Sequence, residues 1–276
     1  MRAALLQLTS SDDPLTNLRV TSEQVRSAAS EGAGFILTPE VTNCVSNSHT
    51  HQRSVLRREA EDPTLEGMRE DAARLGVWML IGSLALLADP PEERFLNRSF
   101  LIAPDGSIAA RYDKLHMFDV QVTETETYKE SAGFKPGEQA VVAKTPVGTI
   151  GLSICYDVRF AYLYRALAKA GAEVIVVPAA FSPATGPMHW EPLLRARAIE
   201  TGSYVLAPAQ MGQHPASRGR SRTTYGHSLA VSPWGEVLVD ADQKFGVHLV
   251  DLDLADVTKA RQKIPSLQHD RDFSGP

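Results

Sequence analysis

The chain of 276 residues has only two cysteines, Cys44 and Cys155, and a net charge of −5. Two cysteines cannot form a disulfide framework, so we expect the reducing cytoplasm. The acidic balance disfavours a general affinity for nucleic acid or anionic membranes. The most apolar segment, 76–88, is too short to span a bilayer, and the N-terminal apolar stretch is too short for a signal peptide. We therefore expect a cytoplasmic protein with no nucleic-acid or membrane partner.

The sequence also lacks the spacings that bind nucleotides and metals. It contains no glycine-rich phosphate loop of recognised spacing. The two histidines of "SHTH", residues 48–51, have no further ligands at tetrahedral spacing, so we interpret this stretch as a polar loop. We expect no cofactor and no metal. The basic stretch 214–222 is interpreted as a surface loop, with contact to a substrate carboxylate or a partner as the alternative.

Strand-like and helix-like segments alternate along the whole chain, and no linker or low-complexity tract interrupts them. The pattern predicts strands at 2–8, 34–40, 77–86, 172–181 and 203–210, helices at 14–32, 61–76, 156–170 and 189–202, and hairpins at 98–114 and 227–242. We expect a single α/β domain, 1–276, with mixed sheets covered by helices. The alternation fits a four-layer α-β-β-α sandwich and also a doubly wound single sheet.

Cys155 lies in "GTIGLSICYDVRFAY", residues 148–162, where an apolar strand gives way to a predicted helix. Free backbone N–H groups of the first helical turn would point past its side chain. A nucleophilic thiol needs a base, and its tetrahedral intermediate needs positive charge or N–H donors. Glu40 and Lys114 also follow predicted strands, where ligands collect. The alternative is that Cys155 is a buried structural cysteine and that Glu40 and Lys114 are ordinary surface charges.

Four stretches carry a family resemblance: "LTPEVTN" around Glu40, "YDKLHMFD" around Lys114, "YKESAGFKPGE" around Glu130 and "GLSICYDVRF" around Cys155. In this order they resemble the signature stretches of the nitrilase superfamily of carbon–nitrogen hydrolases, and the resemblance covers essentially the whole chain. It implies the α-β-β-α sandwich and a homodimer or larger homo-oligomer. The segments 180–200 and 225–235 most resemble the branch of deaminated-glutathione amidases and omega-amidases.

The resemblance also implies a Glu40-Lys114-Cys155 triad. Glu40 would be the general base and Cys155 the nucleophile, and Lys114 with the backbone N–H of Tyr156 would hold the oxyanion. Glu130 would orient Lys114. The substrate would be a small amide bearing a carboxylate, hydrolysed through a Cys155 thioester to an acid with release of ammonia. A nitrilase, an N-carbamoyl hydrolase and a catalytically silent scaffold are the alternatives.

Three further residues are expected to bind substrate. Arg159 follows Cys155 by four residues, so on the first turn of the predicted helix it would face the site and could bind a carboxylate in two hydrogen bonds. Its alternative role is to pair with Asp157 or another loop carboxylate. Phe181 and Thr185 are the other two. Cys44 is expected to be a spectator near the site.

Overall fold

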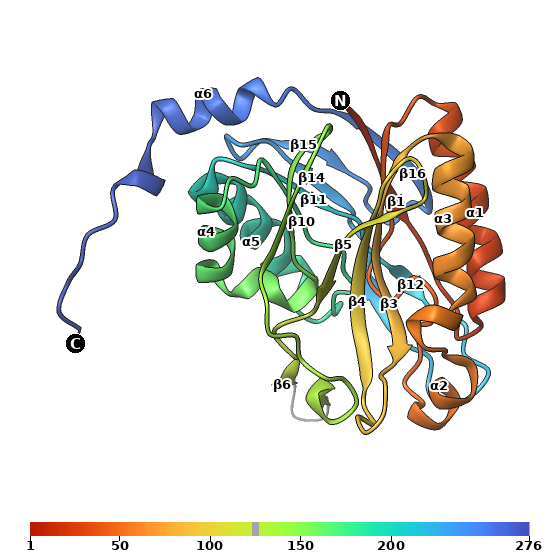
Figure 1. The fold of residues 1–276 in the computed structure, drawn as a ribbon. Coiled ribbons are helices and arrows are strands. Elements are labelled where there is room, and N and C mark those ends of the chain that lie inside the picture. Colours follow the sequence, from red (N-terminus) through yellow and green to blue (C-terminus); the bar gives the residue numbers. More distant parts are fainter. Residues whose placement is uncertain (123–126, 276) are drawn as a thin grey trace.

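Two six-stranded sheets face each other in the computed structural model, which describes residues 1–122 and 127–275 (Figure 1). The first sheet contains, in spatial order, β16 (Gly246–Asp251), β1 (Arg2–Gln7), β2 (Phe35–Leu37), β3 (Trp78–Leu87), β4 (Phe95–Ile102) and β5 (Ile108–Asp113). The second contains β15 (Val237–Asp240), β14 (Leu229–Val231), β11 (Tyr204–Ala207), β10 (Val174–Val176), β9 (Gly148–Leu152) and β8 (Val141–Thr145).

Helices cover the outer face of each sheet, which gives the four-layer α-β-β-α sandwich (Figure 1). On the first sheet lie α1 (Pro14–Ser30) and α3 (Pro63–Leu75), and on the second lie α4 (Ala161–Lys169) and α5 (Gly186–Thr201). The burial pattern agrees with the layers, because alternate strand residues enter two different clusters. Leu5 and Leu37 pack with Leu152 and Val176 between the sheets, whereas Leu6 packs outward with the helices.

The centre of each sheet is parallel, and its margins are antiparallel. Strands β1, β2 and β3 run parallel, as do β9, β10 and β11, while the remaining neighbours pair in the antiparallel sense. The expected hairpins at 98–114 and 227–242 are present as β4–β5 and β14–β15. Within each sheet the carboxyl ends of the parallel strands lie at one edge. At the seam of the two sheets, residues that follow β2 lie near residues that follow β9 and β10.

The helix expected at 156–170 is only partly correct. Residues Cys155–Arg159 form a 3-10 helix, and α4 begins at Ala161. The side chain of Asp157, which is fully buried, accepts hydrogen bonds from the backbone N–H of Ile154 at 2.8 Å and from the hydroxyl of Tyr112 at 2.6 Å. The contact with Tyr112, 45 residues away in the chain, helps to hold the turn in its tighter form, which the local helical pattern could not indicate.

The expectation of a polar loop at residues 48–51 is wrong in part. Helix α2 (His49–Val55) begins there, and the hydroxyl of Ser48 accepts a hydrogen bond from the backbone N–H of His51. Two small hairpins were also not expected: β6 (Asp119–Gln121) with β7 (Thr127–Lys129), and β12 (Met211–Gln213) with β13 (Thr223–Tyr225). Both contribute residues to the pocket described below.

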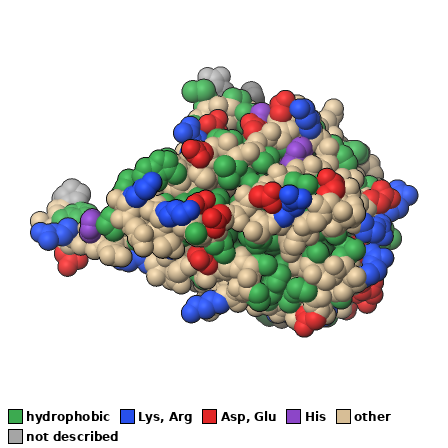
Figure 2. Space-filling model, turned by 90° about the horizontal axis from the view of Figure 1, so that it is seen from above, with side chains coloured by type: hydrophobic (Ala, Val, Ile, Leu, Met, Phe, Trp, Pro, Cys, Tyr) green, Lys and Arg blue, Asp and Glu red, His purple; other side chains and the backbone are tan. Residues whose placement is uncertain are grey.

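After α6 (Ala255–Lys263) the chain still contacts α4, where Arg165 binds Ser266 and Asp270, and it then ends in an extended arm (Figure 1). Figure 2 shows this arm protruding from the body, and acidic and basic side chains are interspersed over the face in view. Among the helices that the structure describes, none is long and apolar enough to cross a membrane.

Candidate active site

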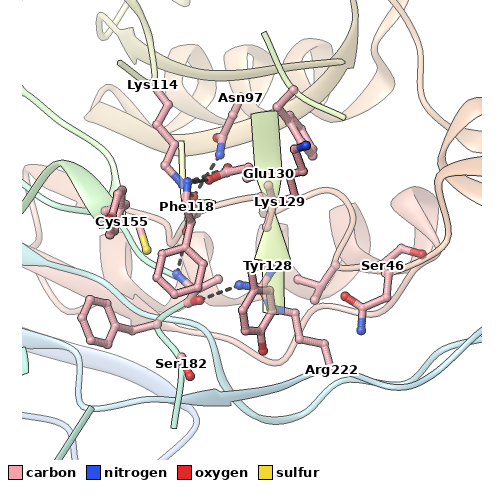
Figure 3. A pocket seen from close by; sticks show the side chains of 18 of the residues that line it. Ser46, Asn97, Lys114, Phe118, Tyr128, Lys129, Glu130, Cys155, Ser182 and Arg222 are labelled. Carbon is pink, nitrogen blue, oxygen red and sulfur yellow. Dashed lines mark hydrogen bonds and ion pairs between the residues drawn. The ribbon is translucent and has the colours of Figure 1, made fainter. Parts of the chain in front are cut away.

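A cavity of about 350 Å³ opens at the seam between the two sheets, beyond the ends of their strands (Figure 3). Glu40 follows β2 and Lys114 follows β5, both from the first sheet. Cys155 follows β9, and Phe181 lies beyond β10, both from the second sheet. The three residues of the expected triad therefore meet in one pocket, and Glu130 lines it with them.

The turn that carries Glu40 is clamped against β3. The hydroxyl of Ser83 accepts a hydrogen bond from the backbone N–H of Val41 at 2.8 Å, and the hydroxyl of Thr38 accepts one from Gly82 at 3.0 Å. A Cβ atom at Gly82 would lie 1.9 Å from the Thr38 carbonyl oxygen, so only glycine permits this approach. The carboxylate of Glu40 is thus fixed at the pocket wall with 4% of the residue exposed.

Lys114 lies between two carboxylates. Its Nζ is 2.9 Å from Oε1 of Glu40 and 2.9 Å from each carboxylate oxygen of Glu130, and only 3% of its side chain is exposed. Glu130 is held in turn by the backbone N–H of Phe118, which donates to Oε2 at 2.6 Å. An ammonium buried to this degree is tolerable only because it is paired and hydrogen-bonded on several sides.

Burial and charge act in opposite directions on the pKa values of this cluster. Burial alone would raise the pKa of Glu40, but the ammonium of Lys114 and the guanidinium of Arg222 outweigh it and the net pKa is lowered. Burial would lower the pKa of Lys114, but Glu130 and Glu40 together raise it. For Cys155, burial and the neighbouring Glu40 carboxylate raise the pKa well above its ordinary value. At neutral pH the cluster therefore holds a carboxylate, an ammonium and a neutral thiol.

Cys155 occupies a backbone conformation that non-glycine residues rarely adopt, with φ of 47°. Its own N–H donates to the carbonyl of Pro178 at 2.9 Å, which ties the turn to the neighbouring strand end. The 3-10 helix Cys155–Arg159 begins here, so the N–H of Tyr156, its second residue, has no acceptor within the helix. Tyr156 lines the pocket, and its N–H is available to an oxygen bound beside the thiol.

Two contributors to the site, Asn97 and the backbone of Ala180, were not identified from the sequence, and a third, Arg222, was included only within the basic stretch 214–222, which was interpreted as a surface loop. Asn97, which is 2% exposed on β4, donates from Nδ2 to Oε1 of Glu40 at 2.9 Å. The backbone N–H of Ala180 donates to Oε2 of the same carboxylate at 2.8 Å. Arg222 lines the pocket and donates from Nη2 to the carbonyl of Ala180 at 2.7 Å. Both oxygens of Glu40 are thereby fixed in direction.

The three residues expected to bind substrate have different outcomes. Phe181 and Thr185 line the pocket. Arg159 does not: it ends the 3-10 helix, its guanidinium lies 5.8 Å from the ring centroid of Tyr156 and 5.6 Å from that of Phe181, and it contacts Nδ1 of His189. Nor does Arg159 pair with Asp157, whose carboxylate is occupied by other donors.

Cys44 lies in the same pocket lining and is 1% exposed. Burial and Asp12 raise the pKa of its thiol to about 12, so it is neutral at physiological pH. Within residues 1–122 and 127–275, no group of three or more His, Cys, Asp or Glu side chains could hold a metal ion.

Known proteins match this chain over nearly its whole length. The family model described as carbon-nitrogen hydrolase matches residues 2–262. A relative from Yersinia enterocolitica, named deaminated glutathione amidase, is 38% identical over 269 residues, which cover 97% of this chain and 92% of that protein. The corresponding human protein of the same name is 36% identical over 271 residues, covering 97% of this chain and 81% of its own length.

Solved structures share the fold. The NitFhit protein of C. elegans is 34% identical and superposes with a TM-score of 0.90 over 98% of this chain, which corresponds to 65% of the NitFhit chain. An amidase mutant from Nesterenkonia sp. AN1 is 27% identical with a TM-score of 0.77, covering 96% of this chain and 98% of that one. In that amidase, acrylamide has added to the active site cysteine.

Proposed function

Since the chain belongs to the carbon–nitrogen hydrolase family and is an amidase, we propose that Cys155 is its nucleophile, with Glu40, Lys114 and Glu130 as the supporting charges. The family resemblance of the four sequence stretches is confirmed, and so is the sandwich fold that it implied. The proposal for the residues rests on one observation: a buried ammonium, held by two carboxylates, lies in one pocket with a buried thiol.

In the proposed first half-reaction, Glu40 takes the proton of Cys155 as Sγ attacks the amide carbon. The lowered pKa of Glu40 and the raised pKa of Cys155 support this order, because the resting pair is carboxylate and thiol. The carbonyl oxygen becomes an oxyanion that receives hydrogen bonds from Lys114 Nζ and the N–H of Tyr156. Glu40 then gives its proton to the departing nitrogen, leaving a thioester.

In the second half-reaction, water attacks the thioester carbon while Glu40 takes a proton from it. The carbon–sulfur bond breaks, the acid is released, and Cys155 recovers its proton. A primary amide yields ammonia, and a peptide-like amide yields an amine. The hydrogen bonds from Asn97 and Ala180 aim the Glu40 carboxylate during both transfers.

For the substrate, we propose a small amide that bears a carboxylate, of the kind named by the relatives as deaminated glutathione. The cavity, at about 350 Å³, lies within the range of pockets that enclose small molecules. Its lining combines aromatic walls, such as Phe118 and Phe134, with a few charged groups.

The proposal is tested by measuring ammonia or amine release from deaminated glutathione, 2-oxoglutaramate, a simple aliphatic amide, a carbamoyl amino acid and a nitrile. We expect the highest kcat/KM for a carboxylate-bearing amide, and loss of that activity in Cys155→Ala. Preference for the nitrile or the carbamoyl compound would overturn the substrate class. Turnover by Cys155→Ala at more than about a thousandth of the wild-type rate would overturn the nucleophile.

We further propose that the whole chain, 1–276, acts as one domain in the cytoplasm, as a homodimer or larger homo-oligomer. Both cysteines are free, which suits a reducing compartment. Several large apolar side chains are exposed, including Met188 at 75% and Trp234 at 52%, and self-association could cover such side chains. Light scattering that gives the mass of a monomer would contradict the assembly.

A further inference from the structure

We infer that Arg222 is the residue that binds the carboxylate of the substrate, the role that the sequence suggested for Arg159. This inference rests on the proposed function. Arg222 belongs to the basic stretch 214–222, but it differs from Arg218 and Arg220, which are exposed, because its side chain enters the pocket (Figure 3).

The position of Arg222 is built into the fold. It directly precedes β13, and its carbonyl accepts a hydrogen bond from the backbone N–H of His214 at 2.8 Å. His214 is itself 1% exposed, and its ring contacts the carbonyl of Ser10 and the hydroxyl of Thr224. The Nη2 contact with Ala180 then directs the guanidinium across the pocket. A residue held at both backbone and side chain loses little conformational freedom when a ligand binds.

Arg222 still has donors to offer. A guanidinium carries five N–H groups in a planar fork, and the structure shows one hydrogen bond from this one. No carboxylate of the described residues lies within ion-pair distance of it, although Glu40 is near enough for the two charges to act on each other. A carboxylate bound in two hydrogen bonds would use the free edge of the fork.

The other cations near the pocket are already committed or poorly placed. Lys114 is held between Glu40 and Glu130. Lys129 is exposed, and its charge acts on Asp119. Arg159 lies outside the lining, against two aromatic rings. Arg222 is therefore the fixed cation best able to receive an anion in this pocket.

The same pocket has polar atoms that lack a partner. Oε1 of Gln52, a residue only 3% exposed, is buried in the lining and makes no hydrogen bond with any described residue. The hydroxyl of Thr185 is in the same situation. A buried polar group without a partner costs free energy. The two residues add polar character to the wall of the pocket that Arg222 also lines.

The carboxylate can belong to the acyl half or to the leaving half of the amide, and three substrates distinguish these. Glutaramate carries it on the acyl half, N-butanoylglycine carries it on the leaving half, and butanamide has none. For Arg222→Gln we expect kcat/KM for the carboxylate substrate that wild type prefers to fall about tenfold or more further than kcat/KM for butanamide. Some loss on butanamide is expected as well, because Arg222 contacts Ala180 and its charge acts on Glu40. Arg222→Lys keeps the charge but not the fork and should lose about tenfold.

Arg220→Gln is the matched control, because it removes the same charge from the same loop outside the pocket and should leave all three rates unchanged. Equal losses on all three substrates with Arg222→Gln, or no loss on any, would overturn the inference. If Arg222→Gln lowers kcat/KM equally for all three substrates and also moves the acid limb of the pH profile of kcat/KM to higher pH, Arg222 acts only through the ionisation of Glu40.

A binding measurement separates this inference from the proposed function. In a Cys155→Ala background, calorimetry gives the Kd of glutarate without turnover, and adding Arg222→Gln should weaken it by about tenfold or more. If wild type hydrolyses no amide, the proposed function fails, and the glutarate Kd still decides the role of Arg222. If wild type is active and an unchanged Kd accompanies unchanged selectivity, only the role of Arg222 fails.

Discussion

Lys114→Met should separate the structural role of the ammonium from its role in the reaction. The substitution keeps a long unbranched side chain but leaves the carboxylates of Glu40 and Glu130 facing each other in the place that Nζ now fills at 2.9 Å from both. Removing one partner of a buried ion pair costs about 3–5 kcal/mol. Because 15% of the Glu130 side chain is exposed, we expect about 3 kcal/mol. At about 2–4 °C per kcal/mol, Tm falls by about 6–12 °C.

The loss of Tm in Lys114→Met should depend on pH, and the environment of Glu40 determines the direction of that dependence. In wild type the pKa of Glu40 is lowered, so its stabilising contribution is present above its ordinary value and is lost as pH falls through the lowered pKa. Without Lys114, burial and the second carboxylate should raise the pKa of Glu40. The variant is then penalised most at neutral pH, and protonation relieves the penalty as pH falls. The difference in Tm from wild type should narrow between pH 8 and pH 5.

The double variant Lys114→Met with Glu40→Gln is the matched control. It removes one of the two negative charges that face each other, and it should therefore regain a large part of the lost Tm without regaining activity. For Lys114→Met alone, kcat should fall by about 100- to 1000-fold, as for loss of an oxyanion donor. Thermal scans at three pH values and amide turnover measure both effects. The electrostatic reasoning would be refuted if Lys114→Met had the wild-type Tm at pH 8. It would also be refuted if the difference in Tm between the variant and wild type became larger as pH falls.

Three further predictions concern the thiols and the base, and one concerns metals. Cys155→Ala should reduce turnover by more than about 1000-fold with an unchanged circular dichroism spectrum; a folded, active variant would remove Cys155 from the mechanism. Cys44→Ala should keep at least about half of the activity, since the Cys44 thiol donates to the backbone carbonyl of Asp12 at 3.8 Å and not to a carboxylate that could act as its base; loss of activity in a folded variant would reverse the assignment. With butanamide, kcat/KM should stay level down to about pH 5, because the lowered pKa of Glu40 keeps the base ionised; an acid limb centred above pH 6 is incompatible with that. EDTA should not change the rate, and inhibition that zinc reverses would contradict the mechanism.

The placement of the three residues of the proposed triad at strand ends could be predicted because the signals are local. The apolar run before Glu40 and the strand before Cys155 are each readable within about ten residues, and both are strands of the structure. That these residues meet was an implication of the family resemblance, because Glu40 and Cys155 follow strands of two different sheets. The continuous helix at 156–170 was wrong for a physical reason, because the turn is held by Tyr112 from another strand.

The residues that were missed depend on register and tertiary contact. Asn97 reaches Glu40 because β4 pairs with β5 in a register that places it beside Lys114, whose N–H donates to the Asn97 carbonyl at 3.0 Å. Its sequence context shows only a polar residue in a strand. Arg222 is one of three arginines within five residues, and the β12–β13 hairpin alone directs it into the pocket. A pattern that repeats one residue type cannot indicate which copy faces inward.

The two sheets that form the pocket come from successive parts of the chain, so the residues of the pocket are synthesised in a fixed order. Glu40 and Lys114 emerge with the first sheet, whereas Cys155, Ala180 and Arg222 emerge with the second. The outermost strand of the first sheet, β16, is also the last to be synthesised. A nascent chain therefore holds the carboxylate and the ammonium of the pocket before it holds the thiol that we propose as the nucleophile. The pocket lining is complete only after Arg222 and Thr223 have been synthesised, and the first sheet only after β16.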